Sequence, residues 1–108
     1  MRDDVHTFQG NLLEGLEKKE AAIERVWVRT DPDWKQDFAR VVMSFARFGV
    51  EFTSDDVCAV VGRPPNQNAV GAAMHKMSQT GQIERVGYQP SRRTDRHGAI
   101  IAVWRGAR

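Results

Sequence analysis

A short segment near the C-terminus concentrates the side chains that are best suited to bind an anion. Residues 89–98 contain Arg92, Arg93, Arg96 and His97 together with a single acid. Arginine keeps its charge at neutral pH, and its planar fork of donors matches a phosphate group or fits a narrow minor groove. We therefore predict that these four residues contact nucleic acid, with a solvated turn as the alternative.

A second set of polar side chains follows the sharp turn at residues 62–65. Asparagine and glutamine can pair with adenine, and histidine and lysine can reach phosphate or guanine, when a helix enters the major groove. The helix face predicted to meet DNA comprises Asn66, Gln67, Asn68, Ala72, His75, Lys76 and Gln79. Arg63 and Ser91 are predicted contacts to the DNA backbone. The alternative for the amides is helix capping with ordinary polar surface.

The sequence lacks the constellations of a catalytic or metal site. The histidines His6, His75 and His97 fall in separate predicted elements, without the spacing of a metal pair. Cys58 lies on a short predicted helix, where packing is its expected role, and no glycine-rich phosphate loop or nucleophile motif is present. We expect a protein that is not an enzyme and that needs no cofactor or metal.

The charge of the chain is divided between its two halves. Residues 1–61 carry 8 Lys or Arg against 12 Asp or Glu, a net of −4, and residues 62–108 carry 8 against 2, a net of +6. A partner meets a surface and not a sum, so this division is more informative than the overall charge of +2. It predicts that a polyanion binds the C-terminal half, with a merely solvated surface as the alternative.

Length and composition indicate one soluble domain. The chain has 108 residues, of which 41% are hydrophobic and 28% are charged, and this balance is typical of globular proteins. A single cysteine excludes an intramolecular disulfide and suits a reducing compartment. No stretch approaches the roughly 20 apolar residues of a membrane span, so a cytoplasmic protein without membrane contact is expected.

The first 30 residues predict one long amphipathic helix, from Asp4 to about Val28. Its apolar residues recur mostly at three- and four-residue steps, at Val5, Phe8, Leu12, Leu16, Ile23 and Trp27. Gly10 and Gly15 each cost about 1 kcal/mol relative to alanine, so the first turns are expected to fray or break unless they are packed. Two interpretations stay open: packing on the protein's own domain, residues 31–108, or a dimerisation arm.

Capping signals predict three further helices. Asp31 and Pro32 begin the first and Gly49 ends it, Thr53 begins a short one with a capping box, and Asn66 begins the last. The buried positions predicted for them are Trp34, Phe38, Val41, Val42, Phe45 and Phe48, then Val57, Val60 and Val61, then Val70, Ala73, Met74 and Met77. The small residues Gly71 and Ala72 predict a close approach by the preceding helix or by a DNA backbone.

Two β-branched segments, residues 83–88 and 99–105, predict strands that flank the basic loop at residues 89–98. Residues 51–53 are expected to add a short third strand. The sequence therefore predicts an α+β fold of the winged helix-turn-helix kind, with three helices, a two- to three-stranded antiparallel wing and an additional N-terminal helix.

Several short motifs resemble small winged-helix DNA-binding proteins encoded by actinobacterial phages and prophages, over about residues 15 to 105. They are Asp31-Pro32-Asp33-Trp34-Lys35, Phe52-Thr53-Ser54-Asp55-Asp56-Val57, Ala69-Val70-Gly71-Ala72, Thr80-Gly81-Gln82-Ile83, Ser91-Arg92-Arg93 and Val103-Trp104-Arg105. The resemblance implies a factor of phage replication or regulation. Thr94 stands where a proline is expected, and the face at His75 and Lys76 has fewer arginines than expected.

Two hypotheses about function follow from these patterns. The first is a non-enzymatic double-stranded DNA-binding protein that acts in regulation, recombination or replication, either as a monomer or as a homodimer joined by the N-terminal helix. The second is a protein-interaction module that binds a host replication or transcription protein through its acidic N-terminal half, by way of an exposed Trp27 or Leu13.

Overall fold

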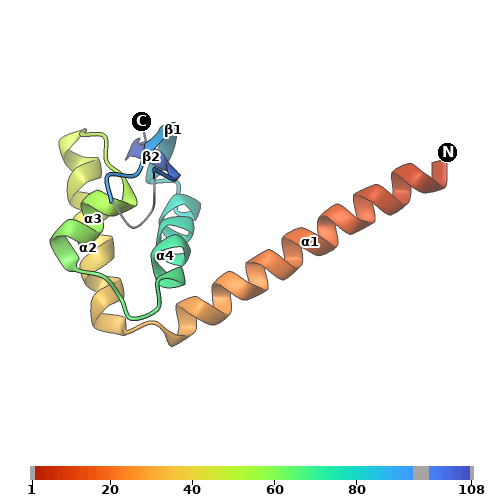
Figure 1. The fold of residues 1–108 in the computed structure, drawn as a ribbon, viewed down its shortest axis with the longest axis horizontal. Helices are drawn as coiled ribbons and strands as arrows, with labels where there is room; N and C mark the ends of the chain where they lie inside the picture. The colour runs from red at the N-terminus through yellow and green to blue at the C-terminus, as the bar shows by residue number, and fades with distance from the viewer. Residues whose placement is uncertain (1, 94–97, 108) are drawn as a thin grey trace.

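Four helices and a two-stranded antiparallel sheet make up the described part of the chain, which confirms the α+β class. The computed structural model describes residues 2–93 and 98–107, and within the first helix it describes the side chains of residue 15 and of residue 17 onward. The elements are α1 (Arg2–Arg29), α2 (Pro32–Phe48), α3 (Ser54–Val61), α4 (Asn68–Gln79), β1 (Ile83–Pro90) and β2 (Ile100–Gly106) (Figure 1).

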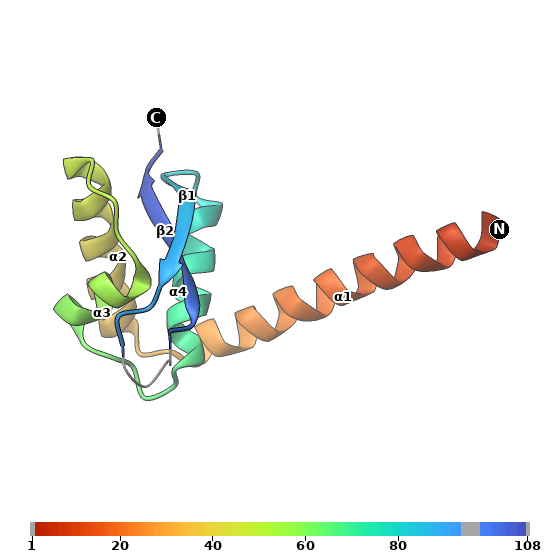
Figure 2. The same cartoon turned by 45° about the horizontal axis from the view of Figure 1, so that its top comes forward.

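Helix α1 projects away from the other elements, and only its C-terminal part lies beside α4 in both views (Figures 1 and 2). Its 28 residues form one helix without a break at Gly10 or Gly15. The single long helix predicted from Asp4 to about Val28 is therefore confirmed. The molecule measures 51 × 31 × 29 Å as a result of this projection. No helix in the described part of the chain has the length and apolar composition that would let it cross a membrane.

Helix α2 begins and ends at the predicted residues. The Asp31 side chain accepts a hydrogen bond from the backbone N–H of Asp33 at 3.1 Å, and Gly49 adopts a left-handed conformation with φ of 70°. Phe38 and Val42 are fully buried. The burial predicted for Phe48 is wrong, because 78% of this residue is exposed. It is the last residue of the helix and lies beyond the core.

The capping box predicted for α3 is confirmed. Thr53 donates its backbone N–H to the Asp56 carboxylate at 2.8 Å, and its hydroxyl accepts from the N–H of Asp56 at 3.3 Å. Val57 and Cys58 are buried, whereas Val60 is 65% exposed, contrary to prediction. Successive helix residues are turned by about 100°, so the face centred between Val57 and Cys58 leaves Val60 at its edge.

The two strands form a hairpin, by which we mean β1, β2 and their connection. Gln89 and Pro90 pair with Ile101 and Ile100, so the strands continue into the segment predicted as loop. The predicted third strand is reduced to one bridge, in which Phe52 and Trp104 exchange hydrogen bonds of 2.9 and 2.8 Å. This bridge ties the start of α3 to the sheet.

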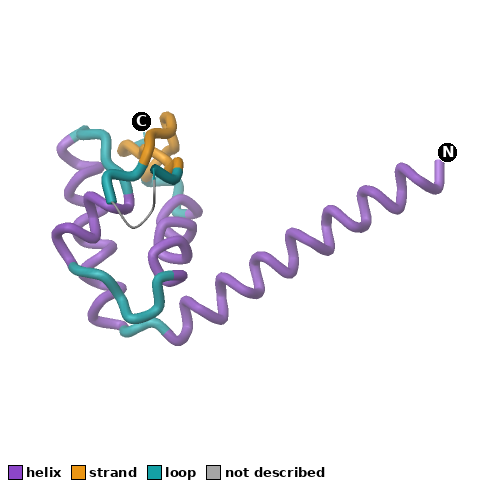
Figure 3. The backbone as a smooth tube through the Cα atoms, viewed as in Figure 1, coloured by secondary structure: helices purple, strands orange, loops and turns teal. Residues whose placement is uncertain are grey.

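The core lies where α2, α3 and α4 meet the two-stranded sheet, which is drawn in orange in Figure 3. Buried residues from every one of these elements or their connections contribute to it: Phe38, Val42, Phe52, Val57, Cys58, Val70, Ala73, Met74 and Ile83. The Phe45 and Phe52 rings stack with centroids 5.3 Å apart. The burial predicted for Val70, Ala73 and Met74 is confirmed, and Met77 packs against the core while half-buried.

Two glycine substitutions test this packing. A Cβ at Gly106 would lie 2.5 Å from the Ala46 carbonyl oxygen, so Gly106→Ala forces the backbone to shift and should lower the free energy of unfolding by about 1–3 kcal/mol. Gly71→Ala is the matched control, because no heavy atom lies within 4 Å and alanine favours the helix by about 1 kcal/mol. Denaturant unfolding measures both variants. Equal changes in the free energy of unfolding for the two variants would contradict the close approach of Gly106 to the Ala46 carbonyl.

Candidate nucleic-acid interface

The Asp55 carboxylate brings the start of the hairpin connection to the segment between α3 and α4. It accepts a hydrogen bond of 2.5 Å from the Ser91 hydroxyl, and it lies 3.9 Å from the guanidinium of Arg63. Ser91 is 7% exposed and the Asp55 side chain 13%. Two segments that are far apart in sequence are thereby fixed at one end of the domain (Figure 2).

The amide side chains predicted to read bases lie at the start of α4. Asn66, Gln67 and Asn68 are all exposed. The helix begins at Asn68 and its N-cap position is Gln67, so the predicted start at Asn66 is wrong by one residue; the Asn66 side-chain oxygen still accepts from the backbone N–H of Asn68 at 3.0 Å. Gln67 makes no side-chain capping bond at this helix start. Two of the three amides are thus available to a partner while the third fixes the helix terminus.

Two of the predicted hairpin cations directly follow Ser91, which Asp55 holds. Arg92 is exposed, and Arg93 is half-buried with its backbone N–H donating to the Ser91 hydroxyl at 3.3 Å. Arg96 and His97 lie outside the described residues. The Asp55 link therefore holds Arg92 and Arg93 within the same end of the molecule as Arg63.

Helix α1 covers the middle of α4, contrary to the prediction that this face is open. His75 pairs with Glu20 of α1 at 3.1 Å, and Lys76 pairs with Glu24. Ala72 was predicted to be exposed but is only 3% exposed, and it lines a small cavity together with Ile23 and Val26 of α1. The close approach predicted at Ala72 is thus made by α1, and not by α3.

Gly71 and Gln79 remain exposed at other points of α4. Gln79 is the last residue of the helix, about 17 Å from its first residue at 1.5 Å per residue. The predicted site residues of α4 therefore divide into three groups: an accessible helix start, a middle that is paired with α1, and a distant end.

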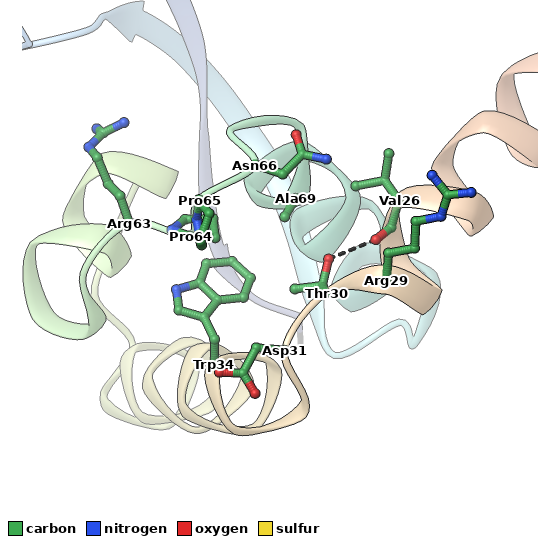
Figure 4. Close-up of a pocket in the computed structure, with 10 residues that line it drawn as sticks. All are labelled: Val26, Arg29, Thr30, Asp31, Trp34, Arg63, Pro64, Pro65, Asn66 and Ala69. Carbon is green, nitrogen blue, oxygen red and sulfur yellow. Dashed lines mark hydrogen bonds between the residues drawn. The ribbon is translucent and has the colours of Figure 1, made fainter.

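A cavity of about 490 Å³ adjoins the helix start, between the end of α1, the start of α2 and the turn before α4 (Figure 4). Trp34 forms its floor beside Pro64 and Pro65, and the indole N–H donates to the Gly62 carbonyl at 3.0 Å. Arg29 and Arg63 lie on opposite sides, with Asn66 between them.

Sequence reasoning missed three of these residues. By sequence, Arg29 belongs to the acidic half of the chain. The signal that could have identified it is a basic residue in the last turn of α1. Trp34 was assigned to the core alone. Asp55 was assigned to helix capping, and nothing in the sequence indicates its contact with Ser91, 36 positions away.

Trp27 does not form the exposed contact that the protein-interaction hypothesis assigned to it. It is half-buried against the core, and the Lys35 ammonium lies 4.9 Å from the centre of its ring. Leu13 belongs to the part of α1 whose side chains are not described. Among the described residues, no group of three metal-ligating side chains comes together.

Comparisons with protein families, with curated proteins and with solved structures each gave no match.

A double-mutant cycle measures how firmly Asp55 holds the hairpin. Ser91→Ala and Asp55→Ala should show a coupling energy of about 1–2 kcal/mol in denaturant unfolding, because a nearly buried hydrogen bond to a carboxylate is lost in either variant. Arg63→Ala is the control partner. Its coupling to Asp55 should stay below about 1 kcal/mol, because the pair is longer and more exposed. A larger coupling energy between Asp55 and Arg63 than between Asp55 and Ser91 would show that the Ser91 hydrogen bond is not the main link.

Proposed function

We propose that residues 31–108 form a winged helix-turn-helix that binds double-stranded DNA through the start of α4 and the arginines of the hairpin. The order of three helices followed by a hairpin supports this assignment. In this interpretation α4 is the recognition helix and the hairpin is the wing. The role is non-enzymatic and belongs to regulation, recombination or replication, as the resemblance to phage proteins implies.

The observation that carries the proposal is the convergence of separate segments around Asp55. Asp55 contacts Arg63, which precedes the exposed amides of α4 by three residues, and it also contacts Ser91, which directly precedes Arg92 and Arg93. Amides supply paired donors and acceptors for base edges, and guanidinium groups supply phosphate contacts on either side of a groove. A solvated surface requires no such convergence of segments.

Because α1 lies against the middle of α4, it limits which residues of α4 can contact the duplex. Because Glu20 and Glu24 pair with His75 and Lys76, the middle of α4 is shielded by α1. We infer that the helix enters the major groove by its first turn, with Asn68 and Gln67 nearest the bases. Arg29, beside the cavity next to Asn66, then adds a phosphate contact on the side opposite Arg63.

Removing the two described hairpin cations should weaken binding to all duplexes alike. The paired change Arg92→Ala and Arg93→Ala removes about two phosphate contacts, so the slope of log affinity against log salt should become shallower by about 1.8. Arg47→Ala is the matched control, since Arg47 is exposed in the last turn of α2, away from the proposed interface. Fluorescence anisotropy over a salt series gives the slopes. An unchanged slope in the double variant would rule out the phosphate contacts.

Substitutions along α4 separate binding by the first turn from binding by the whole face. Asn68→Ala should change sequence preference, as read out by selection from random duplexes, because it removes a base contact. His75→Ala together with Lys76→Ala should change DNA affinity less than about twofold, because α1 covers both residues. A large loss of affinity in this second variant would mean that α1 leaves α4 when DNA binds.

A further inference from the structure

We propose that the cavity beside the start of α4 binds one unstacked nucleotide, with its base against Trp34 and a phosphate on either side. The cavity measures about 490 Å³, and cavities of roughly 300–1,000 Å³ hold small ligands in proteins. It lies between the end of α1, the start of α2 and the turn before α4 (Figure 4). The inference goes beyond the proposed contact with a paired duplex and does not depend on it.

The Trp34 indole gives the cavity an aromatic floor that is fixed in place. Its ring N–H donates to the Gly62 carbonyl at 3.0 Å, and the ring packs against Phe38 with centroids 4.9 Å apart. Trp34 is only half-buried, and it borders the cavity. Every base has a π-face that can stack on an aromatic side chain. A ring that is already held in position loses little freedom when a base stacks on it.

Apolar side chains surround the indole. Those that line the cavity with it are Val26, Pro64, Pro65 and Ala69. Among the described residues of the lining, Asp31 is the one acid, and its carboxylate accepts the backbone N–H of Asp33 and thereby caps α2. A base that enters the cavity therefore exchanges water for apolar contacts.

Two guanidinium groups border the cavity on opposite sides. Figure 4 shows Arg29, at the end of α1, on one side and Arg63, before α4, on the other. Arg29 is exposed, and Arg63 reaches the Asp55 carboxylate only at 3.9 Å. A guanidinium binds a phosphate through paired hydrogen bonds. A nucleotide within a strand carries a phosphate on each side of its sugar, so it matches this arrangement better than an aromatic acid with a single charge does.

Asn66 lies between the two arginines and supplies a donor for the edge of the base (Figure 4). Its side-chain oxygen accepts from the backbone N–H of Asn68 at 3.0 Å, so its amide nitrogen is left to donate. Every base carries acceptors on its edge. A base inside a duplex is stacked between its neighbours, so the nucleotide that enters is either an unpaired one of a strand or a free one.

Calorimetry on the full chain with 2′-deoxyadenosine 3′,5′-bisphosphate, which has one base and two phosphates, tests the proposal. We expect a dissociation constant of about 1 mM or below. Deoxyadenosine lacks the phosphates and deoxyribose 3′,5′-bisphosphate lacks the base, so each should bind at least about tenfold more weakly. An NMR spectrum of the three indole N–H groups locates the ligand, because the bisphosphate should move the signal of Trp34, which Trp34→Phe identifies.

Substitution of the bordering arginines tests the phosphate contacts. Arg29→Ala should raise the dissociation constant of the bisphosphate about tenfold, and Arg63→Ala about threefold, because Asp55 already engages Arg63 in part. Arg25→Ala is the matched control and should change it less than about twofold, since Arg25 is exposed one turn earlier on α1 and does not line the cavity. Circular dichroism checks that each variant keeps its helices. Equal losses in Arg25→Ala and Arg29→Ala would reduce the effect to general charge and overturn the proposal.

A duplex with one unpaired adenosine, compared with the same duplex fully paired, distinguishes the two sources of the nucleotide. A Trp34 signal that moves with the unpaired duplex assigns the cavity to a strand, and one that moves with the bisphosphate alone assigns it to a free nucleotide. A signal that moves with neither probe overturns the proposal, and so does equal affinity for the bisphosphate with and without its base. The duplex contact of Arg92 and Arg93 is measured on fully paired DNA, so its failure is distinguishable from this one.

Discussion

The close packing of α4 on two sides is the constraint on which the rest of the structure depends. One side faces the core through Val70, Ala73 and Met74, and another meets α1 at Ala72. Alanine side chains are short, so neighbouring elements can approach the helix axis without a clash, and close-packed interiors tolerate little change in volume. A larger residue at position 72 would push α1 outward and expose His75 and Lys76. The position of α1, and with it the accessible part of α4, thus follows from one small side chain.

The packing of α1 on α4 also brings acidic side chains beside basic ones. In sequence, the acids and the cations fall largely in different halves of the chain, but Glu20 and Glu24 lie beside His75 and Lys76 in space. The side chains of both pairs are partly exposed, so each pair contributes only about 0–1 kcal/mol. They orient α1, while the apolar contacts around Ile23 and Val26 hold it. What remains of the positive excess lies toward the start of α4 and the hairpin, a smaller region than the sequence division implied.

The extent to which the fold was predictable differs between local and distant interactions. The caps at Asp31 and Thr53 were predicted because each depends on residues only two or three positions away. The exposure of Phe48 and Val60 was not, because helical periodicity identifies a face but not where the core beneath that face ends. For the site, the exposed amides and Arg92 were predicted from residue type. The Asp55 link and the cover of α1 over α4 were not, because they join segments 36 and more than 50 positions apart.

The number of arginines on one domain limits the affinity that the proposed DNA interface can reach. One domain offers few phosphate contacts, mainly from Arg92, Arg93, Arg63 and Arg29, and with each contact contributing a salt-dependent increment, four of them give modest binding at physiological ionic strength.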